Sequence, residues 1–154
     1  MVKQELGKTT VANLLERLYE PQKGEIRINE KDYREYSISS IRNKIGYIMQ
    51  EVQIVPNSII DNIKYVNKKI TKEEIIKIFR KLKLHEKIMS LPKNYHTDIY
   101  ENPDILSTGE RQIISFARIM AMNPDVIILD EVTSNLSWDN EALIKNAINQ
   151  VTKR

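Results

Sequence analysis

Cysteine is absent from the chain of 154 residues, so neither a disulfide framework nor a thiolate metal site can form, and a reducing compartment is the natural setting. Long apolar stretches are lacking too: no run exceeds four residues, as at 126–129, far below the roughly 20 that a membrane-spanning helix needs. Glycine and proline are sparse, with four and five residues, which argues against disorder. The remaining balance, 41% hydrophobic and 29% charged residues, predicts one globular domain whose membrane link comes only through a partner.

The chain carries a net charge of +3, and much of the excess lies in a lysine-rich stretch between Lys64 and Lys87. Such a stretch can bind nucleic acid. The pattern favours the solvated face of an amphipathic helix, because Thr71 and Glu74 match a capping box. Apolar residues follow at helical spacing, at Ile75, Ile78, Phe79 and Leu82. We therefore expect no nucleic-acid partner.

Periodicity and turn residues divide the chain into helices that alternate with short strands. We expect helices over 7–19, 59–91, 107–122 and 141–151, strands over 25–29 and 44–49, and a connector over 92–107. The apolar run 126–129 is typical of a buried parallel strand that delivers carboxylates at its carboxyl end. This order of elements predicts an α/β fold.

Gly7-Lys8-Thr9-Thr10 opens the first predicted helix and matches the second half of the phosphate-binding loop GxxxxGK[ST]. In such a loop the Lys8 ammonium would reach the β and γ phosphates of a nucleotide, and the Thr9 hydroxyl would ligate magnesium. An ordinary helix start explains the same residues, and this alternative stays open for the motif taken alone.

The segment 125–131, DVIILDE, has the form of a strand that ends in two acids. Asp130 would hold the magnesium ion shared with Thr9, and Glu131 would accept a proton from the attacking water. The alternative is that the two acids only cap the helix that follows.

LSTGERQ, at 106–112, stands directly before the helix that leads into DVIILDE. It resembles the LSGGQ signature of ABC transporter ATP-binding cassettes, in the LSxGERQ form of bacterial multidrug-type exporters. The resemblance implies that Ser107, Thr108, Gly109 and Glu110 cap the γ-phosphate of the ATP held by an opposite cassette, at a helix N-terminus. Ser107 is equally suited to be the N-cap of that helix.

The resemblance continues along nearly the whole chain. It covers YEPQKGEIRIN, RNKIGYIMQE, SIIDNIKY, LPKNYHTDIYEN and ARIMAMNPDVIILDEVTSN. It implies a P-loop NTPase core with a parallel sheet over about 1–57 and 106–154, and an inserted α-helical subdomain over about 58–105. It also implies that Gln50 contacts magnesium or the attacking water and relays its state to membrane domains.

The same resemblance implies ATP and Mg²⁺ as cofactors, and two partners: a second cassette, identical or different, and the transmembrane domains of an exporter. It places the chain at the cytoplasmic face of the cell membrane. A soluble cassette ATPase acting on DNA is the competing function, and the exporter-like segment at 91–101 counts against it.

The chain departs from the family pattern in the phosphate loop, where Val2 and Glu5 replace glycines, and in the following loop, where Ser137 replaces aspartate. A carboxylate at Glu5 opposes a bound polyanion. The strand before the loop, the adenine-stacking aromatic residue and the switch histidine are not found. These departures predict negligible ATP hydrolysis by the chain and leave a catalytically impaired or remnant cassette as the alternative function.

Neither histidine has a catalytic partner nearby in the sequence. We expect His85 on a helix surface and His96 in the connector, both solvated. Trp138 is expected to serve packing.

Overall fold

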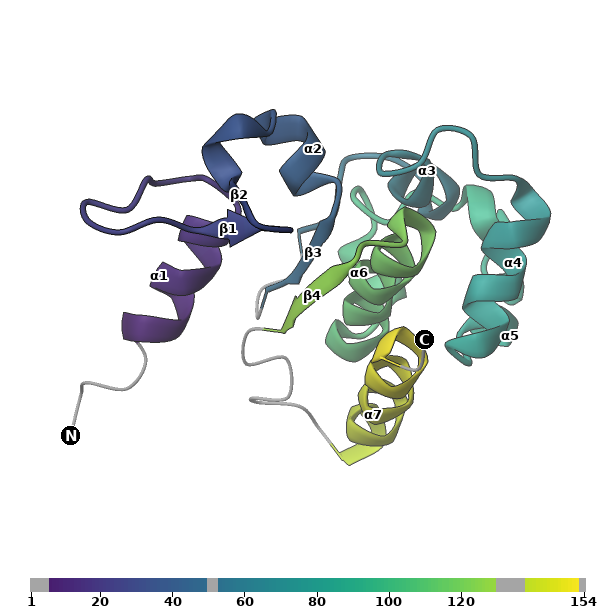
Figure 1. Cartoon of the computed structure of the whole chain (residues 1–154). Helices are drawn as coiled ribbons and strands as arrows, with labels where there is room; N and C mark the ends of the chain where they lie inside the picture. Colours follow the sequence, from purple (N-terminus) through teal and green to yellow (C-terminus); the bar gives the residue numbers. More distant parts are fainter. Residues whose placement is uncertain (1–5, 50–52, 130–137, 153–154) are drawn as a thin grey trace.

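The computed structural model describes residues 6–49, 53–129 and 138–152. Within them, helices and short strands interleave, as expected for an α/β fold (Figure 1). In chain order the elements are α1 (Leu6–Leu15), β1 (Arg27–Ile28), β2 (Lys31–Asp32), η1 (Tyr33–Glu35), α2 (Ile38–Arg42), β3 (Ile45–Ile48), α3 (Ile59–Lys64), α4 (Lys72–Lys81), α5 (His85–Met89), η2 (Asn94–His96), η3 (Pro103–Ile105), α6 (Thr108–Met122), β4 (Val126–Leu129) and α7 (Trp138–Thr152).

The strands β3 and β4 pair in parallel although helices α3 to α6 separate them in sequence. The register places Ile45 opposite Val126 and Ile48 opposite Leu129. β4 was expected to be buried, and this is wrong: Val126 is 48% exposed. Within the described residues, β3 is the only strand that pairs with β4.

α6 packs closely against this strand pair, and a glycine permits the close approach. A Cβ at Gly46 of β3 would lie 2.7 Å from Ile119 Cδ1 and 2.8 Å from Pro124 Cγ. α6 ends at Met122, and the N–H of its C-cap residue, Asn123, donates to the Ile119 carbonyl at 2.9 Å. The left-handed backbone of Asn123 (φ 53°) then turns the chain out of the helix. The chain thus turns from α6 directly into β4.

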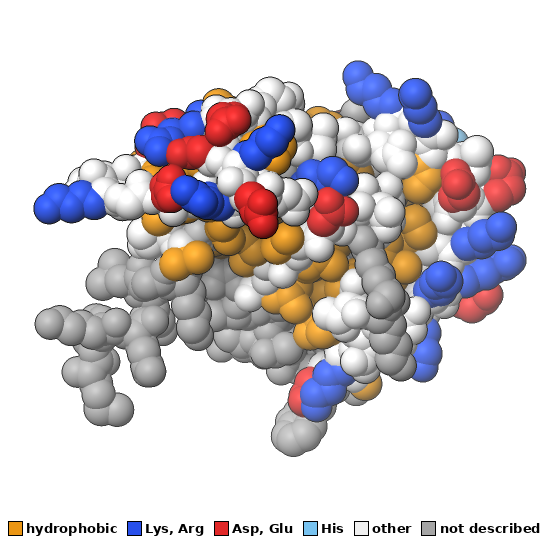
Figure 2. All heavy atoms as spheres, in the orientation of Figure 1, with side chains coloured by type: hydrophobic (Ala, Val, Ile, Leu, Met, Phe, Trp, Pro, Cys, Tyr) orange, Lys and Arg blue, Asp and Glu red, His pale blue; other side chains and the backbone are white. Residues whose placement is uncertain are grey.

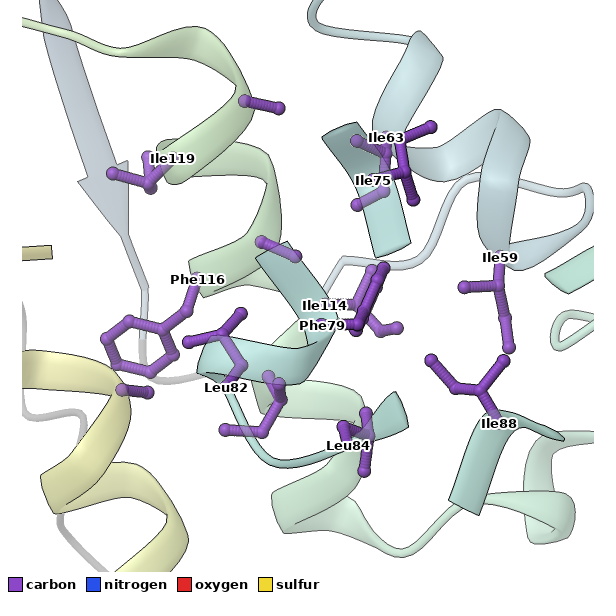
Figure 3. Packing of buried hydrophobic residues seen from close by; sticks show 14 of the residues in the cluster. Ile59, Ile63, Ile75, Phe79, Leu82, Leu84, Ile88, Ile114, Phe116 and Ile119 are labelled. Atoms are coloured by element: carbon purple, nitrogen blue, oxygen red, sulfur yellow. The ribbon is translucent and has the colours of Figure 1, made fainter. Parts of the chain in front are cut away.

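The main core lies where α3, α4, α5, α6 and α7 meet, and Figure 3 shows its side chains pointing toward one another. Phe79 of α4, Ile114 and Phe116 of α6, and Ile63 of α3 are fully buried in it. Burying one such side chain contributes about 1.5–3 kcal/mol, so this cluster is the main source of stability. The buried residues of α6 extend from Gly109 to Ala121, along most of the helix.

Local signals start the helices where the sequence predicts. Thr71 forms the expected capping box with Glu74 at the start of α4. Ile75 and Phe79 face the core, whereas the lysines of α4 are exposed and interspersed with acids along the edge of the molecule that α4 and α5 form (Figure 2). The helical region 59–91 is not continuous, however: it forms three helices, and Lys83 between α4 and α5 adopts φ 58°.

α1 ends at Leu15, four residues earlier than the expected end at position 19. The Arg17 N–H donates to the Leu14 carbonyl and the Leu18 N–H to the Asn13 carbonyl, at 3.1 and 2.9 Å, and Arg17 has φ 52°. This is a Schellman ending. It is stabilised by tertiary contacts, because the Arg17 guanidinium lies 5.2 Å from the centre of the Tyr33 ring.

The expected strand over 25–29 is reduced to β1, which pairs with β2 in an antiparallel hairpin. Its two loop residues, Asn29 and Glu30, have φ of 49° and 67°. Positive φ at both positions is the geometry of a type I′ turn, which closes the hairpin after only two paired residues.

Candidate functional site

The carboxyl ends of β3 and β4 define the first part of the candidate site. Ile48 and Leu129 are register partners, so both strands end at one edge of the sheet. The arrowheads of β3 and β4 point to the side of the molecule on which α1 begins (Figure 1). In open α/β sheets, ligands bind outside the carboxyl ends of the strands. The predicted residues Gln50, Asp130 and Glu131 lie just after these strands and outside the described residues.

The backbone of the predicted phosphate-binding residues lies in the first turns of α1. Gly7, Lys8, Thr9 and Thr10 all belong to this helix. The side chain of Thr10 is exposed, while those of Lys8 and Thr9 are outside the described part of the structure. A helix N-terminus at this point presents backbone N–H groups, which suit a phosphate.

A small second core fixes α1 relative to the strands. Tyr33, Ile41 and Ile45 are buried together, and Leu15 of α1 and Ile128 of β4 pack against them. Because the cluster joins the end of α1 to both β3 and β4, it sets the direction in which α1 approaches the sheet.

The signature residues form the start of α6. The Ser107 Oγ accepts a hydrogen bond from the Glu110 N–H at 3.2 Å, and the Glu110 carboxylate accepts one from the Ser107 N–H at 2.7 Å. Ser107 is thus the N-cap of a complete capping box. Ser107 and Thr108 are exposed and Gly109 is buried. An exposed helix start of this kind can receive an anion through its first-turn N–H groups.

Three polar side chains near the predicted site were not anticipated: Asn62, Gln112 and Arg118. Gln112 is 3% exposed and its Nε2 donates to the Met49 carbonyl at 3.2 Å, next to the end of β3. A sequence signal exists for Gln112, since it occupies a position on the apolar face of α6 one turn before Phe116. A polar residue at such a position indicates a buried hydrogen bond.

A hollow of about 250 Å³ lies beside these contacts. Apolar and aromatic side chains contribute most of its lining, including Tyr47, Met49 and Tyr65, and Glu16 and Arg118 contribute charge. Burial raises the pKa of the Glu16 carboxyl, and the Arg42 guanidinium offsets part of that rise. Burial lowers the pKa of Arg118. Because the pKa of an arginine starts far above neutral pH, the side chain keeps its charge.

The expectation of a solvated His85 is wrong, whereas His96 is exposed as expected. The His85 side chain is 13% exposed, and its Nδ1 lies 2.9 Å from the Tyr95 hydroxyl. Tyr95 packs edge-on against Phe79, and burial raises the pKa of Tyr95 to about 12. This pair joins α5 to η2 in the helical region and serves structure. The side chain of Trp138 lies outside the described part.

Two further observations concern metal-binding clusters and membrane spans among the described residues. They contain no cluster of three or more acidic or histidine side chains that could hold a metal ion, and the predicted magnesium ligands Gln50 and Asp130 are not among them. None of their helices combines the length and apolar character needed to cross a bilayer.

Known proteins resemble this chain along most of its length. A family model described as ABC transporter matches residues 6–134. The "Putative multidrug export ATP-binding/permease protein YgaD" of Bacillus subtilis is 37% identical over 147 residues, which are 96% of this chain and 25% of that protein. A "Probable ABC transporter ATP-binding/permease protein" of Haemophilus influenzae is 39% identical over 142 residues, 92% of this chain and 26% of that protein.

The likeness extends to eukaryotes. The "Iron-sulfur clusters transporter ABCB7, mitochondrial" of Oryzias latipes is 35% identical over 96% of this chain and 20% of that protein. The chain spans between about a tenth and a quarter of the length of the relatives it matches. The family model covers Gly7–Thr10, β3, α6 and β4, and these relatives match more than nine-tenths of this chain at 35–39% identity. The chain therefore belongs to the ATP-binding domains of ABC transporters, with their α/β P-loop NTPase fold.

Proposed function

We propose that the chain binds ATP with Mg²⁺ at the carboxyl edge of β3 and β4, as one of two cassettes that couple ATP binding and hydrolysis to export. Lys8 and Thr9 would hold the phosphates and the magnesium ion, with Asp130 and Gln50 as further magnesium ligands and Glu131 as the base. The core would comprise about 1–57 and 106–154, and the helical subdomain about 58–105.

One observation carries this proposal: β3 and β4 are parallel and in register, with Ile48 opposite Leu129. The chain therefore leaves both strands at the same sheet edge just before Gln50 and Asp130. Acids that follow parallel strands are well placed to hold a cation against nucleotide phosphates, and in phosphoryl transfer such positioning supplies most of the catalysis.

Binding of ATP is tested by titration calorimetry with the chain, with and without Mg²⁺. We expect Lys8→Ala to weaken the affinity at least tenfold, since a charge-assisted contact to phosphate contributes on the order of 1.5–3 kcal/mol. Lys77→Ala, which removes an exposed lysine of α4, is the matched control and should leave the affinity unchanged. Absence of ATP binding at millimolar concentration would refute the proposal.

The start of α6 is proposed to face the ATP of the second cassette, because Ser107 and Thr108 are exposed there. Ser107→Arg should then impair turnover at the partner's site and leave ATP affinity at Lys8 largely intact. Loss of binding at Lys8 in this variant would contradict the arrangement. The relatives whose names specify export or permease function support transmembrane domains as the other partner and the cytoplasmic face of the membrane as the location.

Hydrolysis and binding are separable in this proposal. A carboxylate at Glu5 would bring negative charge toward the phosphates. Losing one properly placed donor costs on the order of a hundredfold or more in rate. We expect turnover by the chain itself to stay near background and to rise when glycine replaces Val2 and Glu5. Magnesium-dependent turnover of the unchanged chain that disappears in Glu131→Gln would show that the altered loop is competent.

A further inference from the structure

The positive charge of the chain is concentrated in its helical region. Residues 64–93 contain ten Lys and Arg residues but only three Asp and Glu residues, a net charge of +7. Because the whole chain carries +3, the other residues together carry −4. Charge separated in this way creates a field over one part of the surface and attracts a partner of opposite sign.

The cations of this region are not used in ion pairs within the described part of the chain. Five ion pairs there join a lysine or arginine to an acid, and all five lie outside residues 64–93. A sixth pair joins His85 to Glu86 at 3.9 Å. The Glu74 carboxylate accepts hydrogen bonds from Thr71 in the capping box of α4. The lysines of the region can therefore bind an external partner.

Four of these cations form a surface that we call the basic ladder: Lys77, Arg80, Lys81 and Lys83. All four are exposed, whereas Ile75 and Phe79 of α4 are buried, so the ladder lies away from the core along the edge that α4 and α5 form (Figure 2). Cations in the last turn of a helix also complement its dipole. That accounts for Arg80 and Lys81 but not for Lys77, which lies in the middle of α4.

The spacing of the ladder matches an extended acidic peptide. Lys77 and Lys81 are one helical turn apart, about 6 Å along the helix axis. In an extended chain every second residue points to the same side, and such residues are about 6.6–6.8 Å apart. Acids at alternating positions of an extended segment can therefore meet successive cations of the ladder.

The two ends of the ladder favour a short partner over a continuous anionic surface. Glu73 precedes Lys77 by one turn and Glu86 follows Lys83, and both acids are exposed. A lipid bilayer or a long nucleic acid continues past these acids and is repelled by them, whereas a short peptide is not. Phe79, the only Phe, Tyr or Trp between positions 72 and 89, is buried, so no such ring there can stack on a base.

We propose that the basic ladder is a docking surface for a short, extended acidic segment of a partner protein, with Asp or Glu at alternating positions. Clustered cations are one of the recurring means by which proteins bind acidic motifs. Exposed ion pairs are individually weak and are screened by salt, so the complex depends on several contacts and dissociates as the ionic strength rises. The ladder is separate from the residues proposed above to bind ATP.

The test measures the binding of two fluorescent peptides to the whole chain by anisotropy. Both peptides contain four Glu and four Ser: in one the two residue types alternate, and in the other the four Glu are contiguous. Lys77→Gln/Lys81→Gln removes two ladder cations that are one turn apart. Lys23→Gln/Lys31→Gln, which removes two exposed lysines outside the helical region, is the matched control. Phosphatidylserine vesicles and a single-stranded oligonucleotide are tested in parallel.

We expect the alternating peptide to bind at low salt and to be released as salt is added. Lys77→Gln/Lys81→Gln should weaken its affinity on the order of fivefold, as for the loss of two exposed ion pairs, and the control variant should bind like the wild type. The contiguous peptide should bind more weakly than the alternating one, because half of its acids point away from the ladder in an extended chain. Circular dichroism of both variants checks that they remain folded.

Several results would overturn the proposal. If the alternating peptide does not bind, or binds the ladder and control variants equally, the ladder is not its docking surface. Equal affinities for the two peptides would refute the match to an extended segment. Tighter ladder-dependent binding of the vesicles or the oligonucleotide would assign the surface to another class of partner. The calorimetric ATP titration decides the proposed function separately, so either proposal can fail without the other.

Discussion

Gly46→Ala tests the close contact between β3 and α6 that places the end of β3 beside Gln112. The added Cβ would lie 2.7 Å from Ile119 Cδ1 and 2.8 Å from Pro124 Cγ, closer than such atoms pack. Ile119 is 5% exposed and Pro124 begins the turn into β4, so neither yields without moving a neighbour. Overpacking of this kind costs about 1–3 kcal/mol.

Part of that cost is removable. Ile119→Val deletes the Cδ1 atom at the shorter distance and alone should cost about 0.5–1.5 kcal/mol. In the double variant Gly46→Ala/Ile119→Val the two changes compensate, so the total loss should be smaller than the sum by roughly 1 kcal/mol. The Pro124 contact remains, which keeps recovery incomplete.

Urea unfolding followed by circular dichroism at 222 nm measures the unfolding free energy of the wild type, the two single variants and the double variant. In thermal unfolding, each kcal/mol of lost stability should lower the melting temperature by about 2–4 °C. Strictly additive effects, or a Gly46→Ala chain as stable as the wild type, would refute the claim that this glycine is needed for the approach of α6 to the sheet.

Three further predictions concern α6 and the buried pair in the helical region. Ser107→Ala removes half of the capping box and should lower the unfolding free energy by about 1 kcal/mol, whereas Ser107→Asp, which keeps an acceptor, should not; urea unfolding of both variants decides. His85→Leu leaves the Tyr95 hydroxyl unpaired and should cost about 1–3 kcal/mol, much of which Tyr95→Phe recovers in the double variant; further loss there would contradict the pairing. Because the pKa of Tyr95 is raised to about 12, its stabilising contribution is complete below pH 10 and is lost as pH rises from 10 to 12. Tyrosinate absorbance and unfolding at these pH values, compared with Tyr95→Phe, check this dependence.

Local features of the fold follow from neighbouring residues and were predictable. Thr71 and Ser107 begin α4 and α6 because a capping box joins residues only three positions apart. The buried face of α4 follows from the spacing of Ile75 and Phe79. The family, and with it the proposed site residues, could be recognised because its motifs are short, ordered and contiguous in the sequence.

Tertiary structure decided whatever depends on residues far apart in the chain. The early end of α1 is stabilised by Arg17 lying over Tyr33, and His85 is only 13% exposed, with Tyr95 beside it. The exposure of β4 is likewise a property of its neighbours in space. No local pattern encodes these partners.

The contacts that α6 makes with Met49 and Gln53 show the difference between what the sequence determined and what only the tertiary structure decided. The sequence alone identified Gln50 as a candidate site residue and Ser107 as a helix start, because both lie in short motifs. Only the packing of α6 against β3 and α3 brought Gln112 to Met49 and Arg118 to Gln53, across 63 and 65 positions. The physical reason is that a hydrogen bond requires atoms within about 3 Å, and the distance between such remote residues is set by the core that holds the helix in place.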